Sequence, residues 1–319
     1  MRNFFIISHV VSQVLRRDLP LPFKNVCPQT MNGDELNLLD PYFQSDTWTQ
    51  AMWLDCVKWA SHFKGERNPF PWFPKYCQKS GDDGSKLVHK ISQHMKSVED
   101  NGAQYILYCD ENYPGLLREI NKAPHGFTCL GRPFGENKQE TMISVVGSRR
   151  ASLPALQESF RIGQVLANRG FCVVSGGAYG CDVSAHQGVL AADPSLRSAV
   201  VVLAGGLSKL YPEGNRAVFL RLLQEGGVLL SERLWDDPAR PSDFPARNRI
   251  ITGLSMLTVL MEAQEKSGAL VSARLALDQG REVLVYNPTL QSQSAHGSRM
   301  LMEEGALGFA NMDEFLSLF

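Results

Sequence analysis

Long apolar runs are absent from this sequence of 319 residues, and none approaches the roughly 20 residues that a membrane-spanning helix needs. The cleanest apolar stretches, such as Ser198–Ala204, have the length of a strand. The start, Met1–Arg17, is apolar, but its basic pair comes last and no small-residue cleavage site follows, which predicts a helix and not a signal peptide. We therefore expect a cytoplasmic protein that makes no use of a membrane.

Cysteine is scarce and has no pattern. There are seven, an odd number, with no CxxC pair and no histidine-rich segment beside them. This excludes a disulfide framework and a zinc module, and predicts reduced thiols, most of them buried. The seven are Cys27, Cys56, Cys77, Cys109, Cys129, Cys172 and Cys181.

An excess of charge of one sign is also missing, since 32 Lys and Arg face 33 Asp and Glu, for a net charge of −1. A nucleic-acid coat protein takes its affinity from many cationic contacts to phosphates, so that class is excluded. Any nucleic acid must bind at a local cluster of cations. Hydrophobic residues at 44% and charged residues at 20% describe an ordinary folded protein.

Catalytic motifs are missing as well: the sequence has no HExxH, no GxSxG, no paired metal carboxylates and no cysteine placed beside a histidine. Asp182 and His186, four residues apart on one predicted helix, offer an acid/base or metal pair, although we favour a helix cap for Asp182 and local packing or hydrogen bonding for His186. We expect a binding protein that is not an enzyme, with no catalytic residue, cofactor or metal.

The chain divides into two parts. Residues 1–103 contain four of the five tryptophans and lack any rhythm of strands and glycine turns, which predicts a small, mainly helical amino-terminal domain with a helix near Lys86–Val98. Residues 104–319 alternate short apolar runs with helical periods, which is typical of a doubly wound, mainly parallel α/β sheet.

The predicted strands of this second domain are Tyr105–Tyr108, Phe127–Leu130, Ile143–Val146, Phe171–Val174, Ala199–Leu203, Val228–Leu230, Met256–Met261 and Val283–Val285. The predicted helices are Leu153–Asn168, Asp182–Ala191, Asn215–Glu225, Ala269–Gln279 and Ser298–Glu304.

Three strands end in loops whose composition suits an anion, and parallel α/β sheets place ligands at the carboxyl ends of their strands. Glycines before a helix let backbone N–H groups approach a phosphate, and the helix amino terminus adds partial positive charge. The spacing is neither a P-loop nor GxGxxG, so a tight turn without a ligand remains open. The loops contain Gly147, Ser148, Arg149 and Arg150; Ser175, Gly176, Gly177, Tyr179 and Gly180; and Lys266, Ser267 and Gly268.

Cations in these loops add to the case, because phosphate recognition combines a guanidinium fork with a point charge. Arg149, Arg150 and Lys266 fall on neighbouring loops, although solvated surface charge is the alternative for each. Arg247 and Arg249 flank Asn248, and if a helix starts here the two arginines point differently. In one hypothesis, one arginine contacts the ligand while the other holds the loop that contains Glu262 or Glu265. In the alternative, the contact is a purely structural ion pair.

Taken in order, these segments resemble the DprA/Smf family (DNA-processing protein A) over about 200 residues, from Tyr113 to Ala306. The shared motifs are Val145–Arg149, Val174–Ala178 with Gly180, Asp182, Ala185 and His186, Gly205–Leu207 with Tyr211, Pro212 and Asn215, Leu230–Glu232, Phe244–Pro245 with Arg247–Ile251, Glu262–Ala263 with Lys266–Leu270, Ala273–Arg274, Gln279–Val283, and Gly297 with Glu304–Ala306.

The resemblance implies an extended Rossmann-like domain that binds the backbone of single-stranded DNA, commonly as a homodimer, and helps to load a RecA-type recombinase during DNA uptake or repair. It makes Arg149 and Lys266 the principal phosphate ligands, with Arg247 and Arg249 shaping the pocket. Glycine and serine backbone groups of the three loops act as donors, at Gly147, Ser148, Gly176, Gly177, Ser267 and Gly268.

This chain departs from the family pattern at three places. Tyr179 stands where many members have an arginine, so a cation is replaced by a face on which a base can stack. Ser298 and Arg299 stand where relatives often have Thr or Cys followed by Asn, which brings an arginine toward the pocket region. No carboxy-terminal winged helix is expected after Phe319.

Two other functions stay open. The unusual first 103 residues suit an antitoxin or sensor partner in a phage-defence or toxin–antitoxin system, which would bind a toxin or defence effector. Related Rossmann-like domains also bind or hydrolyse nucleotides, but the PGGxGTxxE motif of those hydrolases is absent from Ala204–Leu207.

Overall fold

The computed structural model describes residues 93–108, 110–134, 141–288 and 293–318. The predicted helix at Met1–Arg17 and nearly all of the predicted amino-terminal domain lie outside the described residues. Residues 93–100 are helical, within and just beyond the end of the helix expected near Lys86–Val98. Val98 on this segment is buried in the core of the second domain.

A nine-stranded, mainly parallel sheet forms the centre of the described fold, in the order β1-β2-β6-β5-β4-β3-β7-β8-β9. The pairings β1–β2 and β2–β6 are antiparallel, and the others are parallel. The strands are β1 (Gln104–Leu107), β2 (Gly126–Gly131), β3 (Met142–Val146), β4 (Cys172–Ser175), β5 (Ala199–Leu203), β6 (Val228–Ser231), β7 (Leu257–Leu260), β8 (Glu282–Tyr286) and β9 (Leu307–Phe309). All eight predicted strands are present, and β9 was not predicted.

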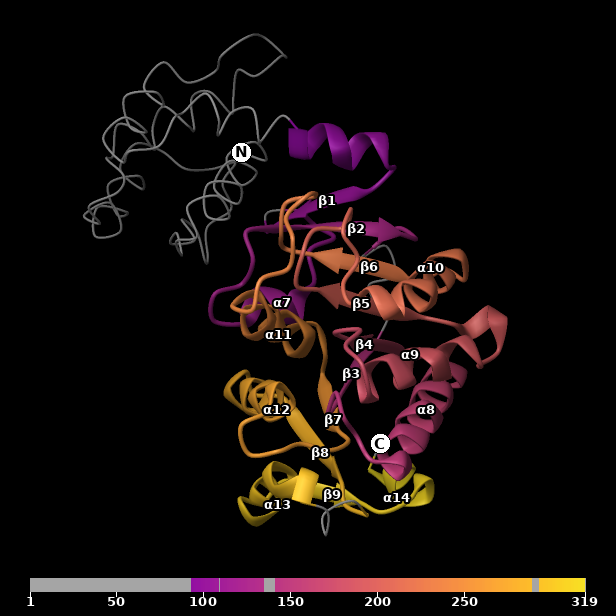
Figure 1. The fold of residues 1–319 in the computed structure, drawn as a ribbon, viewed down its shortest axis with the longest axis vertical. Helices are drawn as coiled ribbons and strands as arrows, with labels where there is room; N and C mark the ends of the chain where they lie inside the picture. The colour runs from indigo at the N-terminus through magenta and orange to yellow at the C-terminus, as the bar shows by residue number, and fades with distance from the viewer. Residues whose placement is uncertain (1–92, 109, 135–140, 289–292, 319) are drawn as a thin grey trace, which may run out of the picture.

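Helices cover both faces of the sheet, so the fold has three layers and confirms the predicted Rossmann-like class (Figure 1). One face carries α7 (Gly115–Glu119), α11 (Asp243–Leu254), α12 (Gly268–Asp278) and α13 (His296–Glu303), and the other carries α8 (Leu153–Asn168), α9 (Cys181–Leu190) and α10 (Arg216–Gln224). Because both faces are covered, strands such as β5 are apolar and buried at every position. Among the described helices, none has both the length and the apolar composition needed to cross a membrane.

The order of the strands reverses at β3. From β3 the chain proceeds through β4 and β5 to β6 on one side, and β7 then pairs with the other side of β3. In open parallel sheets such a switch point opens a crevice outside the carboxyl ends of the two strands. The loops after β3, β4 and β7 therefore meet at one place.

Helices α8 and α9 approach each other so closely that glycine is required at the contact. A Cβ built on Gly163 would lie 2.0 Å from the carbonyl oxygen of Ala185, and one on Gly188 would lie 1.9 Å from that of Phe160. This contact fixes α9 against α8, and with it the glycine-rich turn that precedes α9.

The end of the described chain packs against the sheet. Leu301, Phe309 and Phe315 are fully buried, and the rings of Phe309 and Phe315 lie 5.0 Å apart between β9 and α14 (Met312–Ser317). Leu307, by contrast, is exposed.

Candidate functional site

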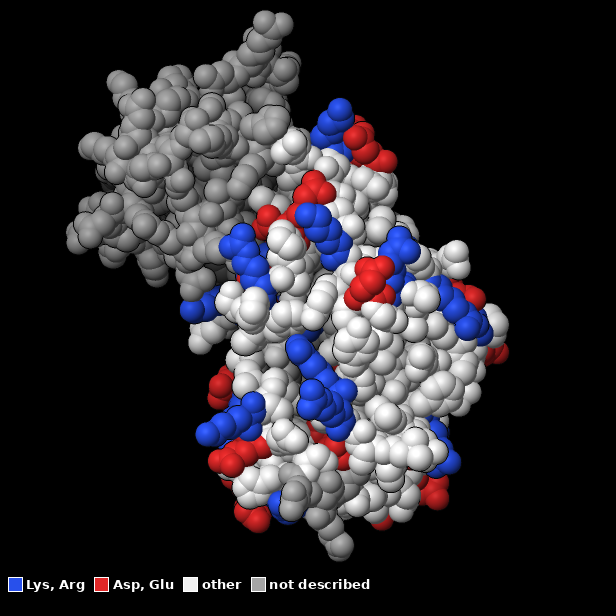
Figure 2. Space-filling model, viewed as in Figure 1, with Lys and Arg blue, Asp and Glu red and all other residues white. Residues whose placement is uncertain are grey.

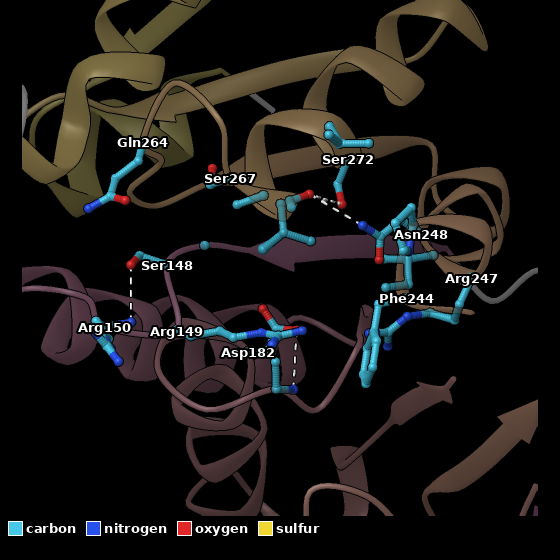
Figure 3. A pocket seen from close by; sticks show the side chains of 18 of the residues that line it. Ser148, Arg149, Arg150, Asp182, Phe244, Arg247, Asn248, Gln264, Ser267 and Ser272 are labelled. Carbon is cyan, nitrogen blue, oxygen red and sulfur yellow. Dashed lines mark hydrogen bonds between the residues drawn. The ribbon is translucent and has the colours of Figure 1, made fainter. Parts of the chain in front are cut away.

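A cleft of about 760 Å³ opens at the switch point. Its walls come from the loop after β3, the starts of α9, α11 and α12, and the loop after β7. Figure 3 shows Ser148, Arg149 and Arg150 on one side, and Gln264, Ser267, Ser272 and Asn248 on the other. The structure thus brings together most of the predicted site residues: Gly147, Ser148, Arg149, Arg150, Arg247, Asn248, Ser267 and Gly268 line this cleft.

Arg149 and Arg150 are the exposed cations of the cleft wall. The guanidinium carbon of Arg149 lies 5.0 Å from the centre of the Phe244 ring, a cation–π contact that leaves its N–H groups available to an anion. The Ser148 hydroxyl accepts a hydrogen bond of 3.1 Å from the backbone N–H of Arg150 and so shapes the loop. Figure 2 shows a group of basic side chains near the centre of the described surface.

Lys266 is exposed on the loop after β7, between Gln264 and Ser267, which line the cleft. Lys266 itself is not among the lining residues, so it stands at the rim. Its position suits a point charge that attracts a phosphate from outside the cleft, while Arg149 lies inside.

Close packing accounts for several glycines of the turn after β4. Gly177 has φ +63° and lies so near Phe219 that a Cβ would come within 2.6 Å of the ring. Its carbonyl oxygen accepts a hydrogen bond of 2.9 Å from the Asn215 amide, and the Ser175 hydroxyl donates to the carbonyl of Val145 at 2.6 Å. Gly180, with φ +82°, passes directly over the Ser148 carbonyl. These residues set the shape of the turn.

Asp182 is the internal anion of this turn. Its carboxylate accepts hydrogen bonds from the backbone N–H groups of Gly176 at 3.2 Å and Ala178 at 3.4 Å. Burial raises the pKa of Asp182, with Arg247 acting in the opposite direction. Those two N–H groups are therefore occupied by the protein. The expected helix cap was wrong in detail, because Gly180 is the N-cap of α9 and Asp182 holds the preceding turn.

Arg247 and Arg249 do point differently, as predicted. Arg247 is buried beneath Gly176 and donates to the Val202 carbonyl, and burial lowers its pKa to about 10. Arg249 does not line the cleft; it pairs with Glu232 at 2.6 Å and donates to the Lys122 carbonyl at 2.9 Å. The structural ion pair is thus present, with Glu232 as the partner.

The expected partners of these arginines, Glu262 and Glu265, are used elsewhere. Glu262 is buried and accepts hydrogen bonds from the backbone N–H and the hydroxyl of Ser152, at 3.2 and 2.7 Å. Glu265 lies 3.8 Å from His296. The prediction that one arginine holds either glutamate loop was therefore wrong, because the nearer carboxylate on the sheet end is Glu232.

The starts of α11 and α12 are joined at the cleft. The Asn248 amide donates to the Gly268 carbonyl at 3.3 Å, and the Ser267 hydroxyl caps α12 by accepting from the Leu270 N–H at 3.2 Å. At Gly268 a Cβ would meet only the Asn248 amide, at 3.9 Å. The backbone there is open to a ligand, and the helix terminus favours an anion.

His186 lies in the core and makes no hydrogen bond within the described part of the chain. Burial lowers its pKa to about 4. Packing was correctly predicted, while a local hydrogen bond was not found. In the described ranges no group of three or more His, Cys, Asp or Glu side chains could hold a metal. The cysteines there, Cys129, Cys172 and Cys181, are buried and form no disulfide with one another.

The motif departure near the end of the chain leads away from the cleft. The Ser298 hydroxyl accepts a hydrogen bond of 3.0 Å from the Ala263 N–H and is buried. The Arg299 guanidinium lies 3.2 Å from a ring nitrogen of His296 and does not line the cleft. The expected arginine near the pocket thus lies beside His296 and outside the cleft lining.

Two aromatic residues of the site, Tyr211 and Phe244, were recognised as parts of family motifs but were not predicted to line the site. Their ring centres lie 5.7 Å apart, and both residues line the cleft. Tyr211 is 50% exposed and Tyr179 is 47% exposed, which is high for large aromatic side chains in a folded protein. Both residues precede a proline, Tyr211 in the segment after β5 and Phe244 in the first turn of α11. That pairing of an aromatic residue with proline was the available signal.

Together these features define a three-layered Rossmann-like protein with a cleft at its switch point that carries exposed arginines and aromatic rings. The sequence model of the family described as DNA recombination-mediator protein A matches residues 104–319, and the chain belongs to this family. The Smf protein of Synechocystis is 32% identical over 273 residues, covering 81% of this chain and 68% of the relative. That of Escherichia coli is 36% identical over 247 residues, covering 76% and 61%.

Solved structures agree with this assignment. The X-ray structure of DNA processing protein A from Streptococcus pneumoniae has a TM-score of 0.67 at 24% identity, covering 100% of this chain and 95% of that one, and shows the shared fold. The Helicobacter pylori protein, whose structure concerns its single-stranded DNA binding mode, has a TM-score of 0.59 at 28% identity, covering 67% and 95%. The chain spans 61–68% of the length of these two Smf proteins.

Proposed function

We propose that this chain binds single-stranded DNA through the phosphate backbone at the switch-point cleft. The observation that carries the proposal is the exposed pair Arg149 and Arg150 on the wall of an open cleft of about 760 Å³, beside exposed aromatic rings. A cationic groove with stacking faces is the usual design for binding single strands without sequence preference. The relative from Helicobacter pylori, studied for its single-stranded DNA binding, supports this choice of ligand.

Each cationic group has a distinct part in the proposal. Arg149 holds a phosphate inside the cleft, Arg150 and Lys266 attract the strand at the rim, and the start of α12 at Gly268 offers its backbone to a second phosphate. Arg247 is a positioning residue, because its guanidinium is used to support Gly176 and the end of β5. Arg249 acts through its ion pair with Glu232, outside the cleft.

The test is a salt series with a labelled poly-dT oligonucleotide, using wild-type chain, Arg149→Ala and Lys266→Ala. Each lost phosphate contact should reduce the slope of log K against log salt by about 0.7 for a single strand. We expect Arg149→Ala to lose more affinity than Lys266→Ala, because it lies inside the cleft. Arg161→Ala, which removes an exposed cation on α8, is the matched control.

Failure of the wild-type chain to bind at low salt would contradict the proposal. That result would favour the partner-protein or nucleotide hypotheses. Release of free base from a nucleoside monophosphate would separate the nucleotide hypothesis from the partner-protein one, and would also contradict the proposal that the chain is not an enzyme.

We further propose that the bound strand is passed to a RecA-type recombinase and that the chain acts as a homodimer. The family description as a recombination mediator supports the first part. Strand exchange by a recombinase on DNA already covered with a single-strand-binding protein should be faster with wild-type chain than with Arg149→Ala. Sedimentation of the chain with and without the oligonucleotide measures its mass in solution and so tests whether it is a dimer.

A further inference from the structure

Asn248 lines the cleft and keeps one hydrogen-bonding atom unused. The residue is only 8% exposed. Its amide nitrogen donates to the Gly268 carbonyl at 3.3 Å, which fixes the orientation of the amide group. The amide oxygen accepts no hydrogen bond within the described part of the chain, and it is not closed off from solvent. It is therefore an acceptor that a ligand in the cleft can reach.

The helices that carry this acceptor also bring apolar surface to the cleft. Ile251 lies three residues after Asn248, on the same face of α11, and it lines the cleft too. Val271, in the first turn of α12, lines the cleft and is 43% exposed. Figure 3 shows Asn248 across the cleft from Ser148 and Arg150. One side of the cleft is thus cationic, and the other combines apolar surface with a single acceptor.

A nucleotide has matching chemistry, with an anionic phosphate at one end and a flat base at the other. The cleft, at about 760 Å³, lies within the range of about 300 to 1,000 Å³ that is typical of sites for small molecules. Each of the four bases has at least one N–H donor on its Watson–Crick edge, so an acceptor can contact this edge without selecting a sequence. In a duplex these N–H groups are used in base pairs, and only an unpaired base offers them.

We propose that Asn248 is the residue that selects single strands, because its amide oxygen accepts a hydrogen bond from the Watson–Crick N–H of an unpaired base. The phosphate of that nucleotide lies toward Arg149. This inference rests on the proposed function and adds a base contact to the phosphate contacts, which a duplex can also make. For thymine the donor is N3–H. One hydrogen bond of this kind corresponds to about a fivefold change in affinity.

The experiment compares two single-stranded probes of equal length, oligo-dT and an oligo-dT that is methylated at N3 of every thymine. The methyl group removes the N–H donor and leaves the phosphate charges unchanged. We expect the full wild-type chain to bind the methylated probe about fivefold more weakly with the same salt slope, because no phosphate contact is lost. Asn248→Ala should bind both probes alike, about as weakly as wild type binds the methylated one. Its affinity for a blunt duplex should equal that of wild type.

Ser272→Ala is the matched control, because the Ser272 hydroxyl donates to the same Gly268 carbonyl, at 3.1 Å. This variant removes one hydrogen bond from that carbonyl and keeps the amide oxygen of Asn248. It should distinguish the two probes as wild type does. Circular dichroism checks that both variants are folded, and the comparison of the two probes with wild type needs no variant at all.

Equal affinity of wild type for both probes, or a preference for unmethylated dT that Asn248→Ala retains, would overturn the base contact and leave the proposed function standing. Loss of the preference in Ser272→Ala as well would assign the effect to the Gly268 carbonyl and would also overturn the base contact. No binding of either probe by wild type would overturn the proposed function, and the base contact with it.

Discussion

Two buried histidines lack a complete set of hydrogen-bond partners. Neither ring nitrogen of His186 has a partner within the described residues, and Nε2 of His94 has none, while its Nδ1 accepts from the Trp235 N–H at 3.1 Å. Burial lowers the pKa of each to about 4, for His94 against the opposing effect of Asp236. Both side chains are thus neutral in the folded protein at neutral pH.

Acid should therefore destabilise the fold before the carboxylates are protonated. Below pH 6.5 the unfolded chain binds protons on these histidines, whereas the folded chain does so only near pH 4. The free energy of unfolding should fall across this window, by at most about 3 kcal/mol for each histidine. Urea unfolding at pH 7 and pH 5 measures the loss.

His186→Met should remove part of this acid sensitivity, because methionine fills an apolar site without a titratable group. His296→Gln, which removes an exposed histidine, is the control. An acid dependence in His186→Met equal to that of wild type would show that His186 does not contribute.

For single residues, the sequence predicted which residues gather at the cleft but not the direction of each side chain. Arg247 and Arg249 are two residues apart on a helix, so they must diverge, yet the choice of which one is buried depends on where α11 sits against the sheet. Tyr211, in the segment after β5, and Phe244, in the first turn of α11, come together although they are 33 positions apart in the numbering. No local sequence pattern encodes a contact between two residues so far apart along the chain.

At the scale of a single element, the close contact between α8 and α9 predicts that an added methyl group in α9 destabilises the fold. An alanine at Gly188 would place its Cβ against the Phe160 carbonyl, which is backbone and cannot rotate away. We expect Gly188→Ala to lower the free energy of unfolding by about 3 kcal/mol, at the upper end for overpacking.

Gly115→Ala is the matched control, because the same methyl group there meets nothing within 4 Å. That change should leave stability equal or raise it by about 0.5 kcal/mol, through helix propensity. Urea melts of the two variants compare them directly. Equal stability of Gly188→Ala and wild type would mean that α9 shifts away from α8 at little cost.

Elements were predictable in proportion to their length and apolar content. The helix Leu153–Asn168 was predicted with both ends correct, and β5 was too, because each has a continuous pattern of buried positions. The strand β9 and the helix α7, with 3 and 5 residues, were missed, since so short a segment shows no period. Their structure is imposed by the neighbouring strand and by α11. The helix α11, with 12 residues, was also absent from the predicted helices, because polar residues such as Arg247 and Asn248 are among its buried positions.

At the scale of the whole molecule, a net charge of −1 limits how DNA can be attracted. Charges farther away than about 10 Å are screened at 0.1 M salt, so only the local cations of the cleft count. With Arg149, Arg150 and Lys266 as contacts, we expect log K to fall with log salt at a slope of about −2. Fluorescence anisotropy at salt concentrations from roughly 20 mM to 500 mM measures this slope.

A slope near −5 would contradict this expectation and would indicate a second basic surface. A slope of about −2 that Arg149→Ala and Arg150→Ala each reduce would place the contacts at the loop after β3. Substituting Arg161 should leave the slope unchanged, because this arginine is exposed on α8 and does not line the cleft.

The turn held by Asp182 has a kinetic consequence. Its N–H groups at Gly176 and Ala178 are already satisfied, and its carbonyl at Gly177 is tied to Asn215, so the turn needs no ligand to take its shape. Capture of a strand then involves no slow ordering of the loop, and the observed association rate should rise in proportion to oligonucleotide concentration without reaching a plateau. A receptor of this kind can take up each stretch of DNA as fast as diffusion delivers it in the right orientation.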